Sequence, residues 1–258
     1  MKKVYEKSEL TFAIACIVVY CVLQSLANPL NRLLGVEYSA SAILCALQAA
    51  VIFRFIKKNG LLERYGLCRS SLPARRFLYY IPLILLATRN LWNGAAVNLT
   101  AAGTACYILC MLCVGFVEEV IFRGFLFRAM AMDNVKAAIV VSSVTFGLGH
   151  LLNLVNGSGA KLAENLFQVT GAIMIGFLFV ILFDRSGSLL PCIITHAAIN
   201  VSSAFANEEG LTAGRRVVLH LILFAITAAY ALFLVKTLPE RRYAESSPKT
   251  DPPAQHPN

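Results

Sequence analysis

Eight long apolar runs follow one another along the chain and are separated by short polar segments. The runs cover residues 11–26, 38–56, 77–91, 104–130, 135–152, 165–183, 189–205 and 216–238. A helix needs about 20 apolar residues to cross the hydrocarbon core of a bilayer, and most of the runs approach or exceed this length. The pattern therefore predicts an all-α, polytopic membrane protein with about eight transmembrane helices.

The composition excludes an ordinary soluble domain. Of the 258 residues, 58% are hydrophobic and 14% are charged, and the mean hydropathy is +0.68. A typical soluble domain carries about 25% charged residues. Lys2 and Lys3 precede the first run as they would in a secretory signal, but no convincing small-residue cleavage site follows it. We therefore expect the first span to be retained, against the alternative of a cleaved signal.

The net charge of +9 is distributed between two sides of the predicted membrane. Both terminal segments and every second connection are rich in Lys and Arg. The remaining connections hold only Arg32, Arg89, Lys161, Arg215 and Arg216. Because basic residues concentrate on the cytoplasmic side, both termini are predicted to be cytoplasmic. The basic surplus is a topology signal and a contact for anionic lipid heads, and we expect no nucleic-acid partner.

Three charges interrupt the fourth run, in the stretch GFVEEVIFRG at 115–124. Unpaired and facing lipid, they would together cost roughly 8–10 kcal/mol on insertion scales. Glu119 and Arg123 are spaced i, i+4 in the favourable acid-first order, so they are predicted to pair. Glu118 lies about 100° around the helix and needs a partner from another segment.

His150 in the fifth run is the partner that the spacing suggests. If the fourth and fifth runs form an antiparallel hairpin that turns near Asp133 and Asn134, Glu118 and His150 lie at similar depth. Gly147 and Gly149, which flank this region, would allow close helix approach. The sequence therefore predicts a carboxylate and an imidazole that can meet inside the membrane.

A second polar pair lies in the seventh run, in the stretch THAAIN. His196 and Asn200 are spaced i, i+4 and share one helix face. Pro191 early in the run places His196 at a shallower depth than Glu118. Either the fourth–fifth hairpin protrudes into the cytoplasm, or the seventh helix enters more deeply than its apolar run suggests.

These groups suffice for cleavage of a bond by water. A carboxylate accepts a proton from water, an imidazole orients the water or shares the proton, and an amide with an imidazole stabilises an oxyanion. The same residues, Glu118, His150 and His196, would also serve as three zinc ligands. The residues leave both possibilities open, zinc or no cofactor.

The three motifs EEVIFR at 118–123, FGLGH at 146–150 and HAAIN at 196–200 resemble the EExxxR, FxxxH and HxxxN motifs of the CPBP intramembrane proteases. This family includes type II CAAX prenyl endopeptidases and bacteriocin-processing or self-immunity proteins. The resemblance implies an eight-helix fold and hydrolysis of a peptide bond within or at the edge of the bilayer. It also implies roles for seven residues: Glu118 as general base with His150, His196 and Asn200 as the oxyanion site, and Glu119, Arg123 and Phe146 as supporting positions. Members are commonly classed as metalloproteases, although a glutamate mechanism without metal is also implied.

Four segments follow from this interpretation. Residues 1–103 form helices 1–3 with a basic cytoplasmic loop, 104–205 the protease core of helices 4–7, 206–240 helix 8, and 241–258 a disordered cytoplasmic tail. The expected function is that of an intramembrane endopeptidase of the bacterial plasma membrane. It would cleave a membrane-associated peptide or protein that is reached from the cytoplasmic leaflet.

Two other function classes remain as alternatives. The first is a non-catalytic membrane scaffold or bacteriocin self-immunity protein, in which the polar cluster only holds helices together. The second is a transporter that uses Glu118 and His150 as a proton relay. The sequence carries no inverted repeat or broken helix pair of the kind that transporters show, which disfavours the second alternative.

Overall fold

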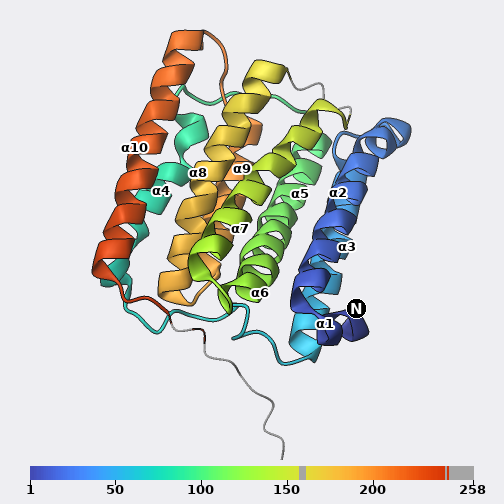
Figure 1. Ribbon diagram of the computed structural model, residues 1–258. Helices are drawn as coiled ribbons and strands as arrows, with labels where there is room; N and C mark the ends of the chain where they lie inside the picture. The colour runs from blue at the N-terminus through green and yellow to red at the C-terminus, as the bar shows by residue number, and fades with distance from the viewer. Residues whose placement is uncertain (157–160, 242, 244–258) are drawn as a thin grey trace, which may run out of the picture.

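The computed structural model describes residues 1–156, 161–241 and 243, and these form a bundle of helices (Figure 1). The α-helices are α1 (Lys2–Lys7), α2 (Glu9–Leu34), α3 (Ser39–Lys58), α4 (Ile81–Ala87), α5 (Ala101–Glu119), α6 (Arg128–Ala131), α7 (Val135–Gly149), α8 (Leu162–Ser186), α9 (Leu190–Ser202) and α10 (Ala213–Thr237). A π-helical segment, η3 (Val120–Phe127), joins α5 to α6. Short 3-10 segments are η1 (Ala74–Tyr80), η2 (Arg89–Leu91), η4 (His150–Leu154) and η5 (Ser203–Phe205).

The helical membrane class is confirmed, but the predicted count of about eight spans is not. Within the described ranges, six helical stretches are long and apolar enough to cross a bilayer. The run at 77–91 yields only the seven-residue α4, because Pro82 starts a helix there and the preceding Leu78, Tyr79 and Tyr80 have left-handed backbone. The run at 189–205 yields the 13-residue α9, which is also shorter than a full span.

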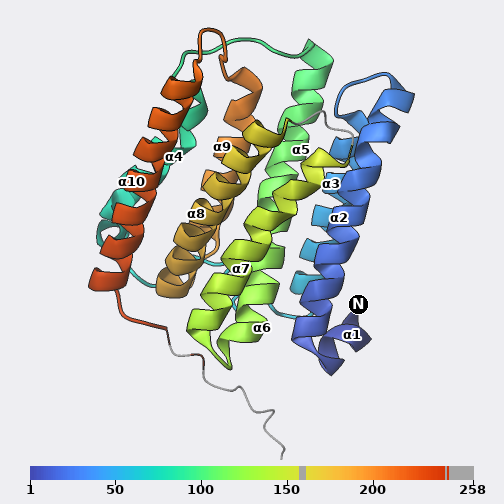
Figure 2. The same ribbon diagram turned by 45° about the horizontal axis from the view of Figure 1, so that its top comes forward.

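The long helices lie in two layers. In Figures 1 and 2 the nearer layer contains α10, α8, α7 and α2, and the farther layer contains α4, α9, α5 and α3. Extensive packing of α7 on α8, of α5 on both α3 and α9, and of α8 on α10 connects the bundle. As a result α5 and α9 are enclosed by other helices, whereas α10 and α2 expose most of their apolar surface, as expected for helices in contact with lipid.

Local sequence signals explain where several helices begin and end. Ser8, Thr100, Asn134 and Thr212 each accept a hydrogen bond from the backbone N–H three residues later and so cap α2, α5, α7 and α10. The predicted polar turn between the fourth and fifth runs is present, since Asn134 caps α7 directly after α6. Capping by polar side chains thus fixes the N-terminal ends of helices whose interiors are almost wholly apolar.

The two ends of the bundle differ in charge. The N-terminus and the C-terminal end of α10 lie at the same end, at the bottom of Figure 1. The elements at this end carry the described basic residues that the sequence assigned to the inner side: Lys2, Lys3, Lys7, Lys57, Lys58, Arg64, Arg69, Arg75, Arg76, Arg128, Lys136, Arg185, Lys236 and Arg241. We call it the basic end. The charge pattern read from the sequence therefore corresponds to one physical face of the fold.

The segment between α3 and η1 folds under the bundle at the basic end. The Leu189 N–H donates to the Gly66 carbonyl at 2.7 Å, and the Ser188 hydroxyl donates to the Cys68 carbonyl at 2.6 Å. These bonds tie the start of α9 to the segment. The predicted disordered tail at 241–258 lies outside the described residues except for Arg241 and Tyr243, and the Tyr243 hydroxyl donates to Asp184 at 2.6 Å.

Candidate active site

The two adjacent carboxylates lie where α5 changes into the π-helical segment. All residues from 117 to 127 are buried, including Glu118, Glu119 and Arg123. A π-helix pairs residues i and i+5 and widens the turn, and such segments occur mostly at functional sites. The change of pitch directs this charged stretch into the bundle rather than toward lipid.

Glu119 and Arg123 form the predicted ion pair, and His196 joins it. Arg123 Nη1 donates to Glu119 Oε1 at 3.1 Å, and neither side chain is exposed to solvent (0% each). His196 Nδ1 lies 2.8 Å from the same Glu119 oxygen. A carboxylate accepts but does not donate, so Nδ1 carries the hydrogen. Glu119 therefore fixes the orientation of the His196 ring in addition to neutralising Arg123.

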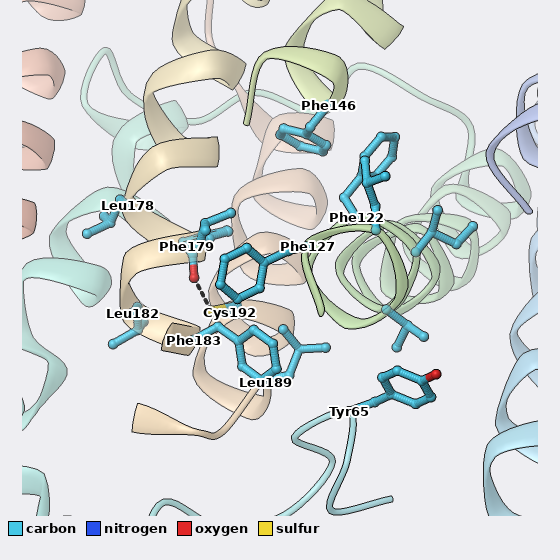
Figure 3. Packing of buried hydrophobic residues seen from close by; sticks show 14 of the residues in the cluster. Tyr65, Phe122, Phe127, Phe146, Leu178, Phe179, Leu182, Phe183, Leu189 and Cys192 are labelled. Carbon is cyan, nitrogen blue, oxygen red and sulfur yellow. Dashed lines mark hydrogen bonds between the residues drawn. The ribbon is translucent and has the colours of Figure 1, made fainter. Parts of the chain in front are cut away.

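Phe146, the aromatic residue of the second motif, packs against both the arginine and the histidines. The Arg123 guanidinium carbon lies 4.1 Å from the Phe146 ring centroid, in cation–π geometry. The same ring contacts His150 and His196 edge-on, with centroid distances of 5.4 and 5.6 Å. Figure 3 shows Phe146 next to Phe122 and above Phe179 and Phe127 in the core. One aromatic side chain thus holds three polar groups in fixed relative positions.

Glu118 has two close partners, Tyr20 and His196. The Tyr20 hydroxyl donates to Glu118 Oε1 at 2.5 Å, and His196 Nε2 lies 3.4 Å from Glu118 Oε2. If the Nδ1 hydrogen points to Glu119 and the ring is neutral, the lone pair of Nε2 faces the Glu118 carboxylate. A hydrogen bond between the two groups would require a proton on one of them. Because the two side chains are in contact, His196 lies at the depth of Glu118, although the sequence suggested a shallower position.

A cavity of about 550 Å³ exposes Glu118. Its wall also contains His150 and Asn200, while His196 lies behind Glu118 and is buried. His150 Nδ1 lies 3.3 Å from the Phe146 carbonyl, which can only accept, so the Nε2 lone pair of the neutral ring stays available. The structure gives the Asn200 side chain no hydrogen-bond partner within the described part of the chain. The predicted meeting of Glu118 with His150 therefore takes the form of a shared cavity, and the imidazole in contact with Glu118 is that of His196.

The zinc alternative finds little support in these positions. Both ring nitrogens of His196 face carboxylates, so neither lone pair is directed to a point shared with His150. Across residues 1–156, 161–241 and 243, no group of three or more His, Cys, Asp and Glu is arranged to hold a metal ion. Glu118, His150 and His196 do not fit a three-ligand zinc site in this arrangement.

The cavity is closed toward the basic end and opens toward the opposite end. Between Glu118 and the basic end the bundle is filled by the fully buried rings of Phe125 and Phe127, and the Tyr65 ring of the underlying segment lies 4.8 Å from that of Phe125. In the other direction the wall continues to the far ends of the helices, through Asn31 near the end of α2 and Tyr107 near the start of α5. Within the described residues, the aqueous path to Glu118 therefore leads from the end opposite the basic end.

Gly115 allows α5 and α9 to approach closely enough for the Glu118–His196 contact. A Cβ at this position would lie 2.8 Å from the Ala197 backbone nitrogen. We expect Gly115→Ala to lower the free energy of unfolding by about 1–3 kcal/mol, because the clash is with backbone that cannot rotate away. Thermal unfolding in detergent measures this. Gly214→Ala, where a Cβ meets nothing within 4 Å, is the matched control, and equal melting temperatures for the two variants would contradict the close-approach explanation.

Sequence reasoning missed two features of the site. Tyr20 is 98 residues from Glu118 in a different helix, and a tyrosine in an apolar span usually signals the membrane interface. The π-helical segment was also not anticipated, because its apolar residues satisfy an α-helical pattern equally well. The two glycines and three charges of GFVEEVIFRG mark the stretch as unusual, but they do not distinguish a π-helical turn from an α-helical one.

Comparison with known proteins agrees with the motifs. A family model described as type II CAAX prenyl endopeptidase Rce1-like matches residues 100–202, which hold all three motifs and about two-fifths of the chain. No curated protein and no solved structure matches the chain. The matched family consists of CAAX-type intramembrane proteases, which are hydrolases. The match over residues 100–202 therefore supports the interpretation of the three motifs as those of the Rce1-like, CPBP intramembrane proteases.

Proposed function

We propose that the protein is an intramembrane endopeptidase in which Glu118 activates water to hydrolyse a peptide bond. The observation that carries the proposal is the setting of Glu118. It is held by Tyr20 and His196 inside the bundle, and it faces a cavity whose wall also bears His150 and Asn200. A buried carboxylate that is oriented by two partners and open to water on one side is suited to act as a general base.

In the proposed reaction Glu118 accepts a proton from a water molecule that also donates a hydrogen bond to Nε2 of His150. The oxygen of this water forms a bond to the carbonyl carbon of the substrate, and the carbonyl oxygen becomes an oxyanion. The Asn200 amide then donates a hydrogen bond to this oxyanion. When the C–N bond breaks, the proton held by Glu118 passes to the leaving nitrogen, so the products are a carboxylic acid and an amine.

His196 receives a different role from the one that the family resemblance implied. Both of its ring nitrogens face carboxylates, and the ring is buried behind Glu118. We therefore assign it to orienting Glu118, and we leave the oxyanion to Asn200. Glu119, Arg123 and Phe146 keep His196 in place and do not touch the substrate.

A comparison of membrane peptide profiles tests the proposal directly. Cells that carry the wild-type protein should contain cleavage products that are missing from cells with Glu118→Ala, at equal levels of folded protein in the membrane. Identical profiles would overturn the proposal. They would instead favour the non-catalytic scaffold or self-immunity protein, whose binding function does not need the carboxylate.

Tyr20→Phe should slow cleavage with little effect on folding. The change removes the hydroxyl that donates to Glu118 and keeps the ring. A hydrogen bond to a charged group is worth about 1.5–3 kcal/mol, so we expect kcat to fall by about 10- to 100-fold. Steady-state kinetics on the purified protein measure this effect. Tyr107→Phe, which loses a hydroxyl contact to Ser203 in the same cavity, serves as the control, and a similar loss in both variants would argue against a specific role for Tyr20.

A further inference from the structure

Two predictions from the sequence conflict once the cavity is located. The charge pattern places the basic end in the cytoplasm, whereas a substrate was expected to arrive from the cytoplasmic leaflet. The cavity that exposes Glu118 is sealed at the basic end by buried rings and by the segment under the bundle. Only one of the two predictions can hold for this fold.

The charge asymmetry is the stronger of the two signals. Fourteen described basic residues belong to the basic end, and only Arg32, Arg89, Lys161, Arg215 and Arg216 lie in the elements at the opposite end. A bias of this size in short connections determines the orientation of a membrane protein. The mouth of the cavity then faces away from the cytoplasm.

The wall of the cavity is rich in side-chain amides. Eight of its residues are asparagine or glutamine: Gln24, Asn28, Asn31, Asn90, Asn153, Asn156, Gln168 and Asn200. Tyrosine and serine hydroxyls and the charged groups of Arg32, Arg89 and Glu37 add to the polar surface. Most of these amides already bond within the protein, as Asn31 does to Ser41 and Asn153 to Gln168. Because an amide both donates and accepts hydrogen bonds, the wall can also pair with the N–H and C=O groups of an extended polypeptide backbone.

The same wall is a poor environment for a prenyl group. An isoprenoid chain buried against this wall would displace water from polar atoms and could not replace its hydrogen bonds, which is costly. An apolar groove of about 690 Å³ lies between α4 and α9, and its lining includes Leu83 and Ile194. No described residue lines both this groove and the cavity. The two spaces are therefore separate in the described structure.

We infer that the substrate of this site is an unprenylated polypeptide segment that enters in extended form from the non-cytoplasmic face. The inference rests on the proposed function and specifies its substrate class and its side of access. The peptide lies along the amide wall, and its scissile carbonyl reaches Glu118 at the base of the cavity.

Proteoliposomes can test both parts of the inference. The full chain with a C-terminal epitope tag is reconstituted, and vesicles with the tag enclosed are isolated by depletion with an antibody. Two quenched fluorescent peptide libraries are added outside: one unmodified, and one identical except for a farnesylated cysteine. We expect Glu118-dependent cleavage of the unmodified library from outside, at a rate about tenfold or more above that of the farnesylated library. Gln168→Leu, which removes an amide from the wall, should raise KM for the unmodified library several-fold.

The controls separate this inference from the proposed function. If neither library is cleaved from either side, or if Glu118→Gln cleaves as fast as the wild type, the proposed function itself fails. If cleavage depends on Glu118 but needs the farnesyl group, or occurs only in vesicles with the tag outside, the proposed function stands and this inference is overturned. Ile194→Trp fills the apolar groove and should leave cleavage of the unmodified library unchanged; a loss of cleavage would place the substrate in the groove.

Orientation in the cell is measured separately. In spheroplasts the C-terminal tag should be inaccessible to antibody until the membrane is permeabilised. Labelling of the tag in intact spheroplasts would overturn the inferred side of access, because the basic end would then face outward.

Discussion

Glu118→Gln is expected to lower the rate of peptide cleavage by about 10³-fold while the free energy of unfolding stays nearly unchanged. Glutamine has the same shape, and its carbonyl oxygen can still accept the hydrogen bond from Tyr20. It cannot take a proton from water at neutral pH. Turnover in proteoliposomes and thermal unfolding of the same preparation measure the two quantities.

Glu119→Gln provides the matched comparison, since it makes the same change at the next residue. This carboxylate is fully buried between Arg123 and His196 and does not line the cavity. Its loss should mainly lower the free energy of unfolding. If the two variants lost activity equally and in proportion to their stability, the division between a chemical and a structural carboxylate would be wrong.

Arg123→Met should produce the largest loss of stability, about 3–5 kcal/mol. The substitution leaves the buried Glu119 carboxylate without its cation, and Arg123 itself is completely enclosed. The double variant Glu119→Met, Arg123→Met removes both charges and should be more stable than Arg123→Met alone, because no uncompensated charge remains. Chemical unfolding in detergent micelles measures the wild type, the single variants Glu119→Met and Arg123→Met, and the double variant.

Arg216→Met supplies the exposed control for that experiment. Arg216 pairs with Glu208 at 3.5 Å near the start of α10, where the glutamate is 67% exposed. Such a pair contributes little, so a change below about 1 kcal/mol is expected. If the double variant lost as much free energy of unfolding as Glu119→Met and Arg123→Met lose together, Glu119 and Arg123 would not act as a pair.

The sequence predicted those parts of the site that depend on local spacing. Glu119 and Arg123 lie four residues apart on a helix, and their pairing follows from helix geometry. Glu118 and His150 could be predicted to lie in the same region, because Asn134 caps α7 directly after α6 and both α6 and η3 pack against α7. Residues within one helix or one tight hairpin are thus accessible to sequence reasoning.

Features that depend on packing between distant helices were not predictable in this way. Nothing in the spacing of α2 indicates that Tyr20 meets Glu118, and the depth of His196 depends on how the segment before η1 holds the start of α9. The predicted count of about eight spans is not confirmed for a related reason. An apolar run of 15 to 17 residues is compatible with a full span or with a short helix in the interior, and only the tertiary structure distinguishes them.

A single-turnover experiment in water enriched in heavy oxygen tests the central claim, that Glu118 activates water rather than attacking the peptide bond itself. Wild-type protein is used in excess over the peptide, so that each molecule cleaves at most once. Mass spectrometry of the product and of the protein then locates the label. The account predicts heavy oxygen in the new carboxyl group of the product and none in the side chain of Glu118. Label in the Glu118 carboxylate together with unlabelled product would show a covalent acyl intermediate and contradict the account.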